Sequence, residues 1–388
     1  MSETAPEPAR RNFRILSLDG GGIRGAFAAG YLAEIERVVD RPIGEYFDLI
    51  AGTSTGGIIA AGLAFRVPAG TIEEFYRDHG SRIFLRRWRR PSRWPSPIKW
   101  LDWLCRIPFR IVIWILNLPL RFLLGLDWGW IARTKYSEEE LVAAMRELLG
   151  ERTLERSENR LLIPSINVKK GQTKVFKTPH LEKLYLDREY RVVDVLRATS
   201  AAPTYFPHAT IDPGSAYVDG GLWANNPTMV AVVESMAIAR DGRQPGDDES
   251  TFDLESTHAL SIGTGSSKFF AAPPGSWAGI AWWNPSRLLN LISLSQSQGA
   301  QFQANYLLGD RLERVEFDLP HGNWTLDNVK LVNEMIHIGK EKAADDIKRL
   351  RGPFFTAVAP KFRPFPSPVR SSNQAGPSDA SPTCDPPT

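Results

Sequence analysis

Short apolar runs alternate along the chain with longer segments whose apolar residues have helical spacing. The first run, Phe13–Leu18, is short and mainly apolar, with β-branched and aromatic residues, and glycines follow it. Apolar residues between Ala26 and Val39 then recur every three or four positions, which is typical of one face of a helix. A second run at 47–51 and a small-residue segment at 58–65 repeat this order. Two successive strand–turn–helix units predict an α/β domain with a mostly parallel sheet.

Further segments of both kinds follow. A helix is expected from Ser137 to Leu149, where Ser137 and Glu140 have the spacing of a capping box. The other expected elements are strands at 161–168, 174–178, 216–218 and 259–262, and helices at 192–201, 229–240 and 328–350. We therefore expect one three-layer α/β/α domain over residues 13–352.

The two ends of the chain and one internal segment depart from this pattern. Residues 1–12 are rich in Pro, Glu and Ala, so we expect a flexible tail and no secretory signal. Residues 353–388 are rich in Pro and Ser, and we expect a disordered tail there. Between about 82 and 135 the composition changes to Arg, Trp, Pro and aliphatic residues, which marks an insertion. No charge-free apolar run approaches the roughly 20 residues that span a bilayer.

Composition excludes several classes of protein. Of 388 residues, 43% are hydrophobic and 23% are charged, the balance of a folded globular protein. The two cysteines, Cys105 and Cys384, are far apart, which excludes a disulfide framework and suits a reducing, cytoplasmic setting. A formal net charge of +3 gives no electrostatic reason to expect a nucleic-acid partner. The sequence contains no cluster of metal-ligating residues, so we expect no metal and no other cofactor.

The turn after the second predicted strand has the pattern G-x-S-x-G. Its residues are Gly52, Thr53, Ser54, Thr55 and Gly56. A serine in a tight strand-to-helix turn exposes its hydroxyl, and flanking glycines avoid clashes with the neighbouring strand and helix. The start of the following helix favours a developing anion. Ser54 is therefore a candidate nucleophile, and the alternative is an ordinary turn with a capping Ser or Thr.

Another glycine-rich turn lies earlier in the chain, one predicted helix and one predicted strand before the Ser54 turn. Its residues are Asp19, Gly20, Gly21, Gly22, Ile23, Arg24 and Gly25. Three consecutive glycines leave backbone N–H groups unobstructed beside a helix start, which suits an oxyanion hole. The same glycines fit the dinucleotide pattern G-x-G-x-x-G. A dinucleotide fold, however, needs an acidic residue at the end of the second strand, where this chain has Ser54 and its glycines.

A serine nucleophile needs a base, and two candidates differ in their setting. None of the six histidines follows a strand in a glycine-bracketed turn, so a partly buried structural role is favoured for His208, the nearest candidate. Asp219 ends the strand 216–218 and precedes two glycines. A carboxylate in that position needs only hydrogen-bond reach to act as a general base. The alternative for Asp219 is a turn-capping role, which is common before glycine.

Three motifs, taken in order, resemble the patatin-like phospholipase family: DGGGIRG at 19–25, GTSTGG at 52–57 and DGG at 219–221. The resemblance extends to TSAAPTYFP at 199–207, NNP at 225–227 and SIGTG at 261–265. It covers the chain from Phe13 to the terminal helix and leaves out the tails and the insertion.

The resemblance implies a Ser–Asp dyad that hydrolyses acyl esters of phospholipids or other lipids without a metal. Ser54 would attack the ester carbonyl, and Asp219 would activate first the serine and then a water. Backbone amides of Gly21, Gly22 and their neighbours would hold the oxyanion. Arg24 would support this loop, approach the substrate phosphate or form a structural salt bridge.

The insertion at 82–135 is basic and amphipathic. It contains twelve Lys or Arg and two acidic residues, and its polar residues Arg106, Arg110, Asn117 and Arg121 lie near one helical face. Basic flanks, Trp residues and a narrow polar stripe are typical of a helix that lies in a membrane surface. We expect peripheral contact with the inner membrane surface through this segment. An intramolecular cap or lid and a nucleic-acid patch are the alternatives.

We therefore expect a lipid acyl hydrolase of phospholipase A or lysophospholipase type, with a phospholipid or another acyl lipid as substrate. Two alternatives stay open. The same enzyme could be silent until a small nucleotide or a partner activates it. A lipid-binding protein could also have kept the fold without turnover.

Overall fold

The computed structural model describes residues 11–84, 134–242, 251–265, 285–319 and 325–367. Apart from its ends, the predicted membrane-contact segment at 82–135 lies outside the described residues. So do residues 1–10 of the predicted N-terminal tail.

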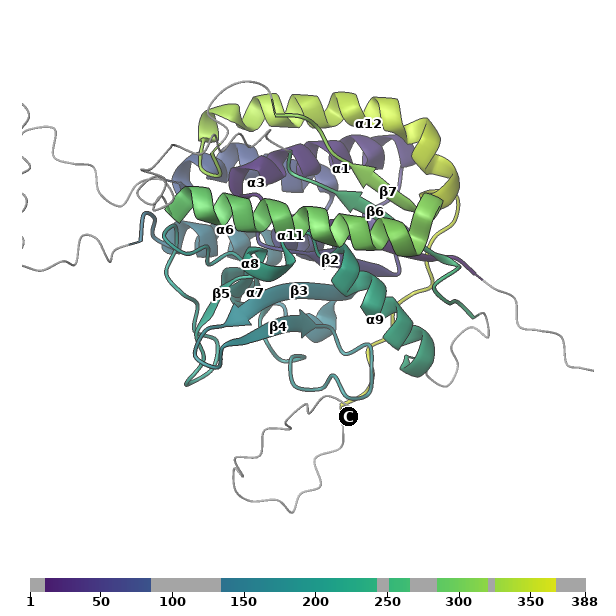
Figure 1. The fold of residues 1–388 in the computed structure, drawn as a ribbon, viewed down its shortest axis with the longest axis horizontal. Helices are drawn as coiled ribbons and strands as arrows, with labels where there is room; N and C mark the ends of the chain where they lie inside the picture. Colours follow the sequence, from purple (N-terminus) through teal and green to yellow (C-terminus); the bar gives the residue numbers. More distant parts are fainter. Residues whose placement is uncertain (1–10, 85–133, 243–250, 266–284, 320–324, 368–388) are drawn as a thin grey trace, which may run out of the picture.

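Strands and helices alternate along most of the described chain (Figure 1). The strands are β1 (Phe13–Leu18), β2 (Leu49–Gly52), β3 (Arg160–Asn167), β4 (Gln172–Lys177), β5 (Tyr217–Asp219), β6 (Thr257–Ile262) and β7 (Leu312–Val315). The helices are α1 (Gly25–Val39), α2 (Thr55–Ala64), α3 (Ala69–Ile83), α6 (Glu139–Leu149), α7 (Val192–Thr199), α8 (Gly221–Ala224), α9 (Thr228–Asp241), α11 (Pro285–Leu308) and α12 (Val332–Phe354).

The strands form one mixed sheet in the order β4-β3-β2-β1-β6-β7, with β5 paired to β3. The pairs β3–β2, β2–β1, β1–β6 and β6–β7 are parallel. Only β4 and β5 run antiparallel to β3 among the described strands. The mostly parallel central sheet predicted from the sequence is confirmed.

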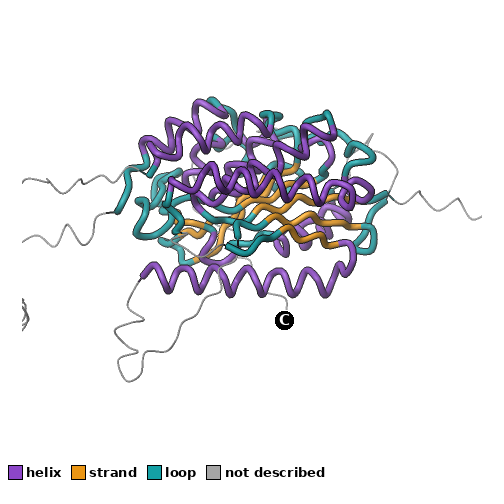
Figure 2. The backbone as a smooth tube through the Cα atoms, turned by 90° about the horizontal axis from the view of Figure 1, so that it is seen from above, coloured by secondary structure: helices purple, strands orange, loops and turns teal. Residues whose placement is uncertain are grey.

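Alternate residues of the central strands enter two separate hydrophobic cores. In β1, Leu16 and Leu18 pack in the core that includes α1, α2 and α12, whereas Phe13 and Ile15 pack in the core that includes α9. Successive side chains of a strand point to opposite faces, so each face of the sheet is covered by helices. Figure 2 shows the strands between these helical layers, which confirms the three-layer α/β/α fold.

Strand β5 brings two distant turns together at one edge of β3. The first part of β3, residues 160–162, pairs with β2, and its last part, residues 165–167, pairs with β5. Strand β4 pairs with the opposite edge of β3. Strands β2 and β5 therefore lie one after the other along the same edge of β3. Because β5 is antiparallel to β2, its final residue Asp219 faces the carboxyl end of β2, where Gly52 leads into the Ser54 turn.

Most expected element boundaries differ from the structure by one to four residues, and two helices illustrate this. Helix α6 begins at Glu139, and the Ser137 hydroxyl accepts a hydrogen bond of 3.4 Å from the Glu139 N–H. The Ser137–Glu140 capping box therefore does not form, because the N-cap residue is Glu138, one position later than this box requires. The helix predicted at 328–350 is α12, which starts at Val332 and ends at Phe354.

The chain after α12 lies against the domain, contrary to a disordered tail from residue 353. The Ala359 N–H donates to the Glu45 carbonyl at 2.7 Å, and the Phe365 N–H donates to the Pro179 carbonyl at 2.7 Å. Phe362 is buried. Aromatic side chains spaced between the prolines thus give this segment an apolar anchor, which its composition alone did not indicate. Residues 368–388 lie outside the described residues.

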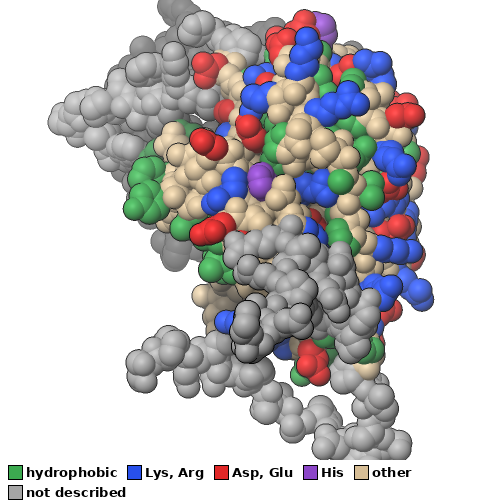
Figure 3. All heavy atoms as spheres, turned by 90° about the vertical axis from the view of Figure 1, so that its right-hand side faces the viewer, with side chains coloured by type: hydrophobic (Ala, Val, Ile, Leu, Met, Phe, Trp, Pro, Cys, Tyr) green, Lys and Arg blue, Asp and Glu red, His purple; other side chains and the backbone are tan. Residues whose placement is uncertain are grey.

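Charged side chains of both signs are interspersed over the face drawn in Figure 3. On the surface of the described chain, Arg37 forms an ion pair with Glu34 and Arg240 forms one with Asp241. Such pairs contribute little to stability because water screens them. The mixture agrees with the small net charge of the chain.

Candidate active site

Ser54 lies between β2 and α2 in a backbone conformation that few residues adopt. Its φ is 54° and its ψ is −122°. The turn is also tightly packed. A Cβ on Gly52 would lie 2.2 Å from the Gly56 carbonyl oxygen, and a Cβ on Gly56 would lie 2.3 Å from the Leu18 carbonyl oxygen. The two glycines let the chain turn sharply, and this turn places the buried Ser54 side chain just beyond the end of β2.

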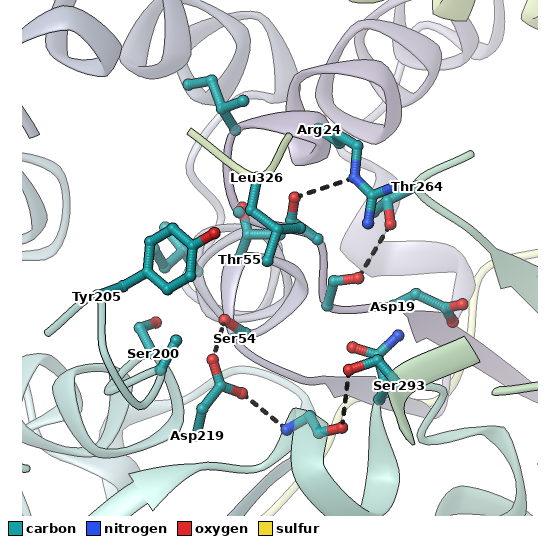
Figure 4. A pocket seen from close by; sticks show the side chains of 18 of the residues that line it. Asp19, Arg24, Ser54, Thr55, Ser200, Tyr205, Asp219, Thr264, Ser293 and Leu326 are labelled. Atoms are coloured by element: carbon teal, nitrogen blue, oxygen red, sulfur yellow. Dashed lines mark hydrogen bonds between the residues drawn. The ribbon is translucent and has the colours of Figure 1, made fainter. Parts of the chain in front are cut away.

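The Ser54 hydroxyl and the Asp219 carboxylate are in direct contact (Figure 4). Ser54 Oγ donates a hydrogen bond of 2.7 Å to Asp219 Oδ2, and the Gly221 N–H donates one of 2.7 Å to Asp219 Oδ1. Burial raises the pKa of Asp219 to about 6, and the two hydrogen bonds limit the rise. A carboxylate with such a pKa can accept a proton near neutral pH and return it later.

The end of α7 is bonded to both members of this pair. The Ser54 N–H donates to Thr199 Oγ1 at 3.0 Å, and Thr199 Oγ1 donates to the Pro164 carbonyl at 2.5 Å. The Asp219 N–H donates to the Ala201 carbonyl at 3.0 Å. One rigid helix end therefore sets the distance between the serine turn and the aspartate strand.

The glycine loop between β1 and α1 forms another wall of the site. Its carbonyl at Gly20 accepts a hydrogen bond of 2.9 Å from Thr264 Oγ1. A Cβ on Gly21 would lie 2.3 Å from that same Thr264 oxygen, and Gly22 has a φ of 57°. Among the described residues, no acceptor lies within hydrogen-bond reach of the Gly21 and Gly22 N–H groups. Such free amides near a serine hydroxyl suit an oxyanion hole.

The rest of the loop is held by its neighbours. The Ile23 N–H donates to the Leu326 carbonyl at 2.8 Å. Arg24 makes two long hydrogen bonds, from Nε to the Gly21 carbonyl at 3.5 Å and from Nη1 to the Gly265 carbonyl at 3.4 Å. Burial lowers the pKa of Arg24, and Glu316 opposes this effect. Arg24 thus contacts the loop, as one expectation held, and it also lines the cavity.

Ser54 and Asp219 line a cavity of about 210 Å³. Its apolar wall includes Ile58, Phe75, Phe84, Leu141, Phe206 and Leu294. A cavity with an apolar wall and a few polar groups at one end suits a ligand with an apolar chain and a polar reacting group. Three or more His, Cys, Asp or Glu side chains that could hold a metal do not come together anywhere in the described ranges.

His208 does not take part in this arrangement. It is exposed, and it is not among the residues that line the cavity. The expectation of a partly buried structural histidine is therefore wrong, because residues 207 and 208 lie at the surface of the loop after the buried Phe206.

Several residues of the site were not singled out in advance. Thr199, Asn225 and Thr264 lie in segments that carried the family resemblance, so a local signal for them existed. No local sequence signal indicates Arg314 on β7, because its partner Asp19 is 295 positions away. Ser200 also lies in a resembling segment, although nothing in its local pattern indicated a role.

No helix in the described part of the chain is both long enough and apolar enough to cross a membrane.

Comparison with known proteins identifies the family. The model of the family "Patatin-like phospholipase" matches residues 16–232. A cGAMP-activated phospholipase of Vibrio cholerae is 30% identical and aligns over 92% of this chain and 98% of its own length. A cGAMP-activated phospholipase of Escherichia coli is 34% identical over 74% of this chain and 72% of its own. The chain therefore belongs to the patatin-like phospholipase family and is a hydrolase of lipid esters.

Proposed function

We propose that Ser54 and Asp219 form the catalytic dyad of this phospholipase. The observation that carries the proposal is the 2.7 Å hydrogen bond between them, which lies at the polar end of a cavity with an apolar wall. A serine hydroxyl is a weak nucleophile unless a base removes its proton. Asp219, whose pKa is raised toward neutrality, supplies that base without a histidine.

In acylation, Ser54 Oγ attacks the ester carbonyl of the lipid while its proton moves to Asp219. The carbonyl oxygen becomes negative and lies against the free amides of Gly21 and Gly22, supported by the rest of the loop Gly20–Gly25. The bond to the leaving alcohol then breaks, and Asp219 returns the proton to that alcohol. In deacylation, a water replaces the alcohol and repeats the sequence, which releases the fatty acid and restores Ser54.

The test is fatty-acid release from vesicles of phosphatidylethanolamine and phosphatidylglycerol, measured by mass spectrometry. Ser54→Ala and Asp219→Asn are each expected to reduce release to the background. Ser295→Ala, a serine on the exposed part of α11, serves as the matched control and should retain activity. Release by folded Ser54→Ala at the wild-type rate would exclude the dyad.

A second candidate function is that of an effector phospholipase switched on by a cyclic dinucleotide. It is favoured by the similarity to the Vibrio cholerae protein, a cGAMP-activated phospholipase, along nearly the whole of both chains. In this case fatty-acid release should rise strongly when cGAMP is added and should not respond to its linear, ring-opened form. Equal rates with and without cGAMP would reject this candidate and leave the dyad unaffected.

We also propose that the basic, Trp-rich segment 82–135 makes peripheral contact with the anionic membrane surface. The support is its composition, with twelve basic and two acidic residues. Replacing Arg86, Arg87, Arg89 and Arg90 by Gln should weaken sedimentation with anionic vesicles and leave hydrolysis of a short soluble ester intact. Loss of both would instead indicate a structural role.

A further inference from the structure

Ser200, the residue after α7, carries a buried hydroxyl in the catalytic pocket. The residue is 6% exposed, it lines the cavity, and its Oγ has no hydrogen-bond partner among the described residues. Burying a hydroxyl without a partner is unfavourable, and such groups in native proteins are almost always satisfied. The missing partner is therefore expected to be a molecule that enters the cavity.

The position of Ser200 is fixed by the same helix end that fixes the dyad. Its N–H donates to the Leu196 carbonyl at 3.0 Å and closes α7. The preceding residue, Thr199, accepts a hydrogen bond from the Ser54 N–H, and the following residue, Ala201, accepts one from the Asp219 N–H. In Figure 4, Ser200 lies on one side of the Ser54–Asp219 hydrogen bond, and Thr264, which holds the glycine loop, lies on the other.

We infer that Ser200 forms the subsite for the oxygen that enters and leaves the reaction: the alcohol of the lipid during acylation and the hydrolytic water during deacylation. This inference rests on the proposed dyad. The glycine loop takes the carbonyl oxygen, so the leaving oxygen must lie elsewhere around the reacting carbon. The free hydroxyl of Ser200 lies across the dyad from that loop.

Alcohol and water share this subsite because deacylation is acylation in reverse with a different oxygen. In the acyl-enzyme, Ser54 Oγ is bonded to the acyl carbon and no longer donates to Asp219 Oδ2. A water takes over that donation with one hydrogen, and its second hydrogen needs an acceptor, because Asp219 Oδ1 is already bonded to the Gly221 N–H. Ser200 Oγ provides this acceptor and so directs the lone pair of the water at the acyl carbon.

The atoms balance at each step. Asp219 takes one proton from the water while the water oxygen bonds to the acyl carbon. The bond from that carbon to Ser54 Oγ then breaks, and the proton passes from Asp219 to Ser54. During acylation, the Ser200 hydroxyl donates to the departing alcohol oxygen while Asp219 protonates it. Ser200 itself keeps its proton throughout.

The experiment compares Ser200→Ala with the wild type on a p-nitrophenyl ester of a medium-chain fatty acid. The leaving group of this ester is an acidic phenol that departs without hydrogen-bond assistance, so acylation should keep its rate. Deacylation should slow by about tenfold, the effect of one lost hydrogen bond. The variant should therefore release a burst of p-nitrophenol, and intact-protein mass spectrometry should detect the acyl-enzyme.

An alkyl ester or a phospholipid gives a second, different expectation. Its alcohol is a poor leaving group, so acylation and deacylation should both slow in Ser200→Ala and no burst should appear. The matched control is Ser235→Ala, which removes a buried serine hydroxyl on α9 outside the cavity and should behave as the wild type on both esters. All assays are run with cGAMP if the wild type requires it.

Two outcomes overturn the inference: unchanged turnover of both esters by Ser200→Ala, or an equal loss of acylation and deacylation on the p-nitrophenyl ester. Labelling of Ser54 by a fluorophosphonate verifies that the site is folded. If Ser200→Ala does not fold, Ser200→Cys keeps the size of the side chain with weaker hydrogen bonding and should give a smaller burst of the same kind. Retained turnover in Ser54→Ala would instead reject the proposed dyad, so the two failures are distinguishable.

Discussion

Arg314 on β7 is partly buried and forms a bidentate ion pair with the buried Asp19, the residue that connects β1 to the glycine loop. Nη1 of Arg314 lies 3.0 Å from Asp19 Oδ1, and Nη2 lies 2.7 Å from Asp19 Oδ2. Arg314 also donates to Glu316 at 2.6 Å, and Glu316 accepts a hydrogen bond of 2.8 Å from the Gly265 N–H. One arginine thus anchors both the start of the glycine loop and the turn whose Thr264 contacts that loop.

Replacing Arg314 by Met should therefore reduce both stability and turnover. The change leaves the Asp19 carboxylate buried without its cation, which costs about 3–5 kcal/mol when a buried pair is broken on one side. Urea unfolding measures this loss. The glycine loop also loses its anchor, so kcat should fall more than KM changes. The double variant Asp19→Asn/Arg314→Met removes the unpaired charge and should regain part of the stability but not the turnover. Recovery of full turnover in the double variant would contradict a positioning role.

Activity should depend on the ionisation of Asp219. The proposed dyad needs the deprotonated carboxylate, and burial raises the pKa of Asp219 to about 6. The rate with a soluble ester should therefore rise with pH through about 6 and level off above pH 7. A profile of kcat/KM between pH 4.5 and 8.5 measures this. A rate that is constant from pH 5 to pH 8 would show that no group with this pKa controls the reaction.

The same pKa predicts an opposite effect on stability. Because the folded-state pKa of Asp219 lies above its ordinary value of 3.8, the folded protein binds the proton more tightly than the unfolded chain does. The stability that this protonation gives is complete below about pH 4 and is lost as the pH rises through about 6. Asp219→Asn avoids the loss, so its melting temperature should exceed that of the wild type at pH 8, and the difference should shrink at pH 5. A lower melting temperature of the variant at pH 8 would contradict this account.

Local patterns in the sequence were sufficient to predict the strands and turns that carry Ser54 and Asp219. The run Phe13–Leu18 is β1 with the same bounds, and the two glycine turns are where the strand–helix connections were expected. The glycines of a tight turn can be recognised in the sequence, because a side chain at Gly52 or Gly56 would collide with the backbone of the turn or of the adjacent strand. Asp219 was singled out because it ends a strand before two glycines, and the structure places it in hydrogen-bond contact with Ser54.

Strand β7, Arg314 and helix α11 were not predicted from the sequence, because they depend on contacts between distant segments. Strand β7 has only four residues, and two of them, Glu313 and Arg314, are charged, so its sequence lacks the apolar signal of a strand. Arg314 is partly buried and meets Asp19 and Glu316 only in the folded protein. Helix α11 likewise lacks a charged face, and its Ser and Gln residues obscure the helical period. A short stretch of sequence does not contain both partners of a long-range contact such as Asp19 with Arg314.

Thr199 should position the Ser54 turn through its hydroxyl. Thr199→Val keeps the shape of the side chain but removes the acceptor for the Ser54 N–H and the donor to the Pro164 carbonyl. Leaving these buried groups unpaired should cost about 1–3 kcal/mol each. Fluorophosphonate labelling of Ser54 should slow in parallel. Thr199→Ser keeps the hydroxyl and should label at a rate close to that of the wild type. If both variants label equally slowly, the methyl group and not the hydroxyl holds the turn.

Gly21 should tolerate no side chain, because its position leaves room only for hydrogen. An added Cβ would lie 2.3 Å from Thr264 Oγ1 and 2.5 Å from Thr264 Cβ, closer than such atoms approach in proteins. Gly21→Ala must therefore displace either the loop or the Thr264 turn, and the oxyanion amides move with the loop. Removing one oxyanion donor costs about 10²–10³ in kcat in a serine hydrolase, and a loss of this size is expected. Gly70→Ala on α3 is the matched control, since nothing lies within 4 Å of the added Cβ, and it should leave the rate unchanged. Full activity of Gly21→Ala in the phospholipid assay would place the oxyanion hole elsewhere in the pocket.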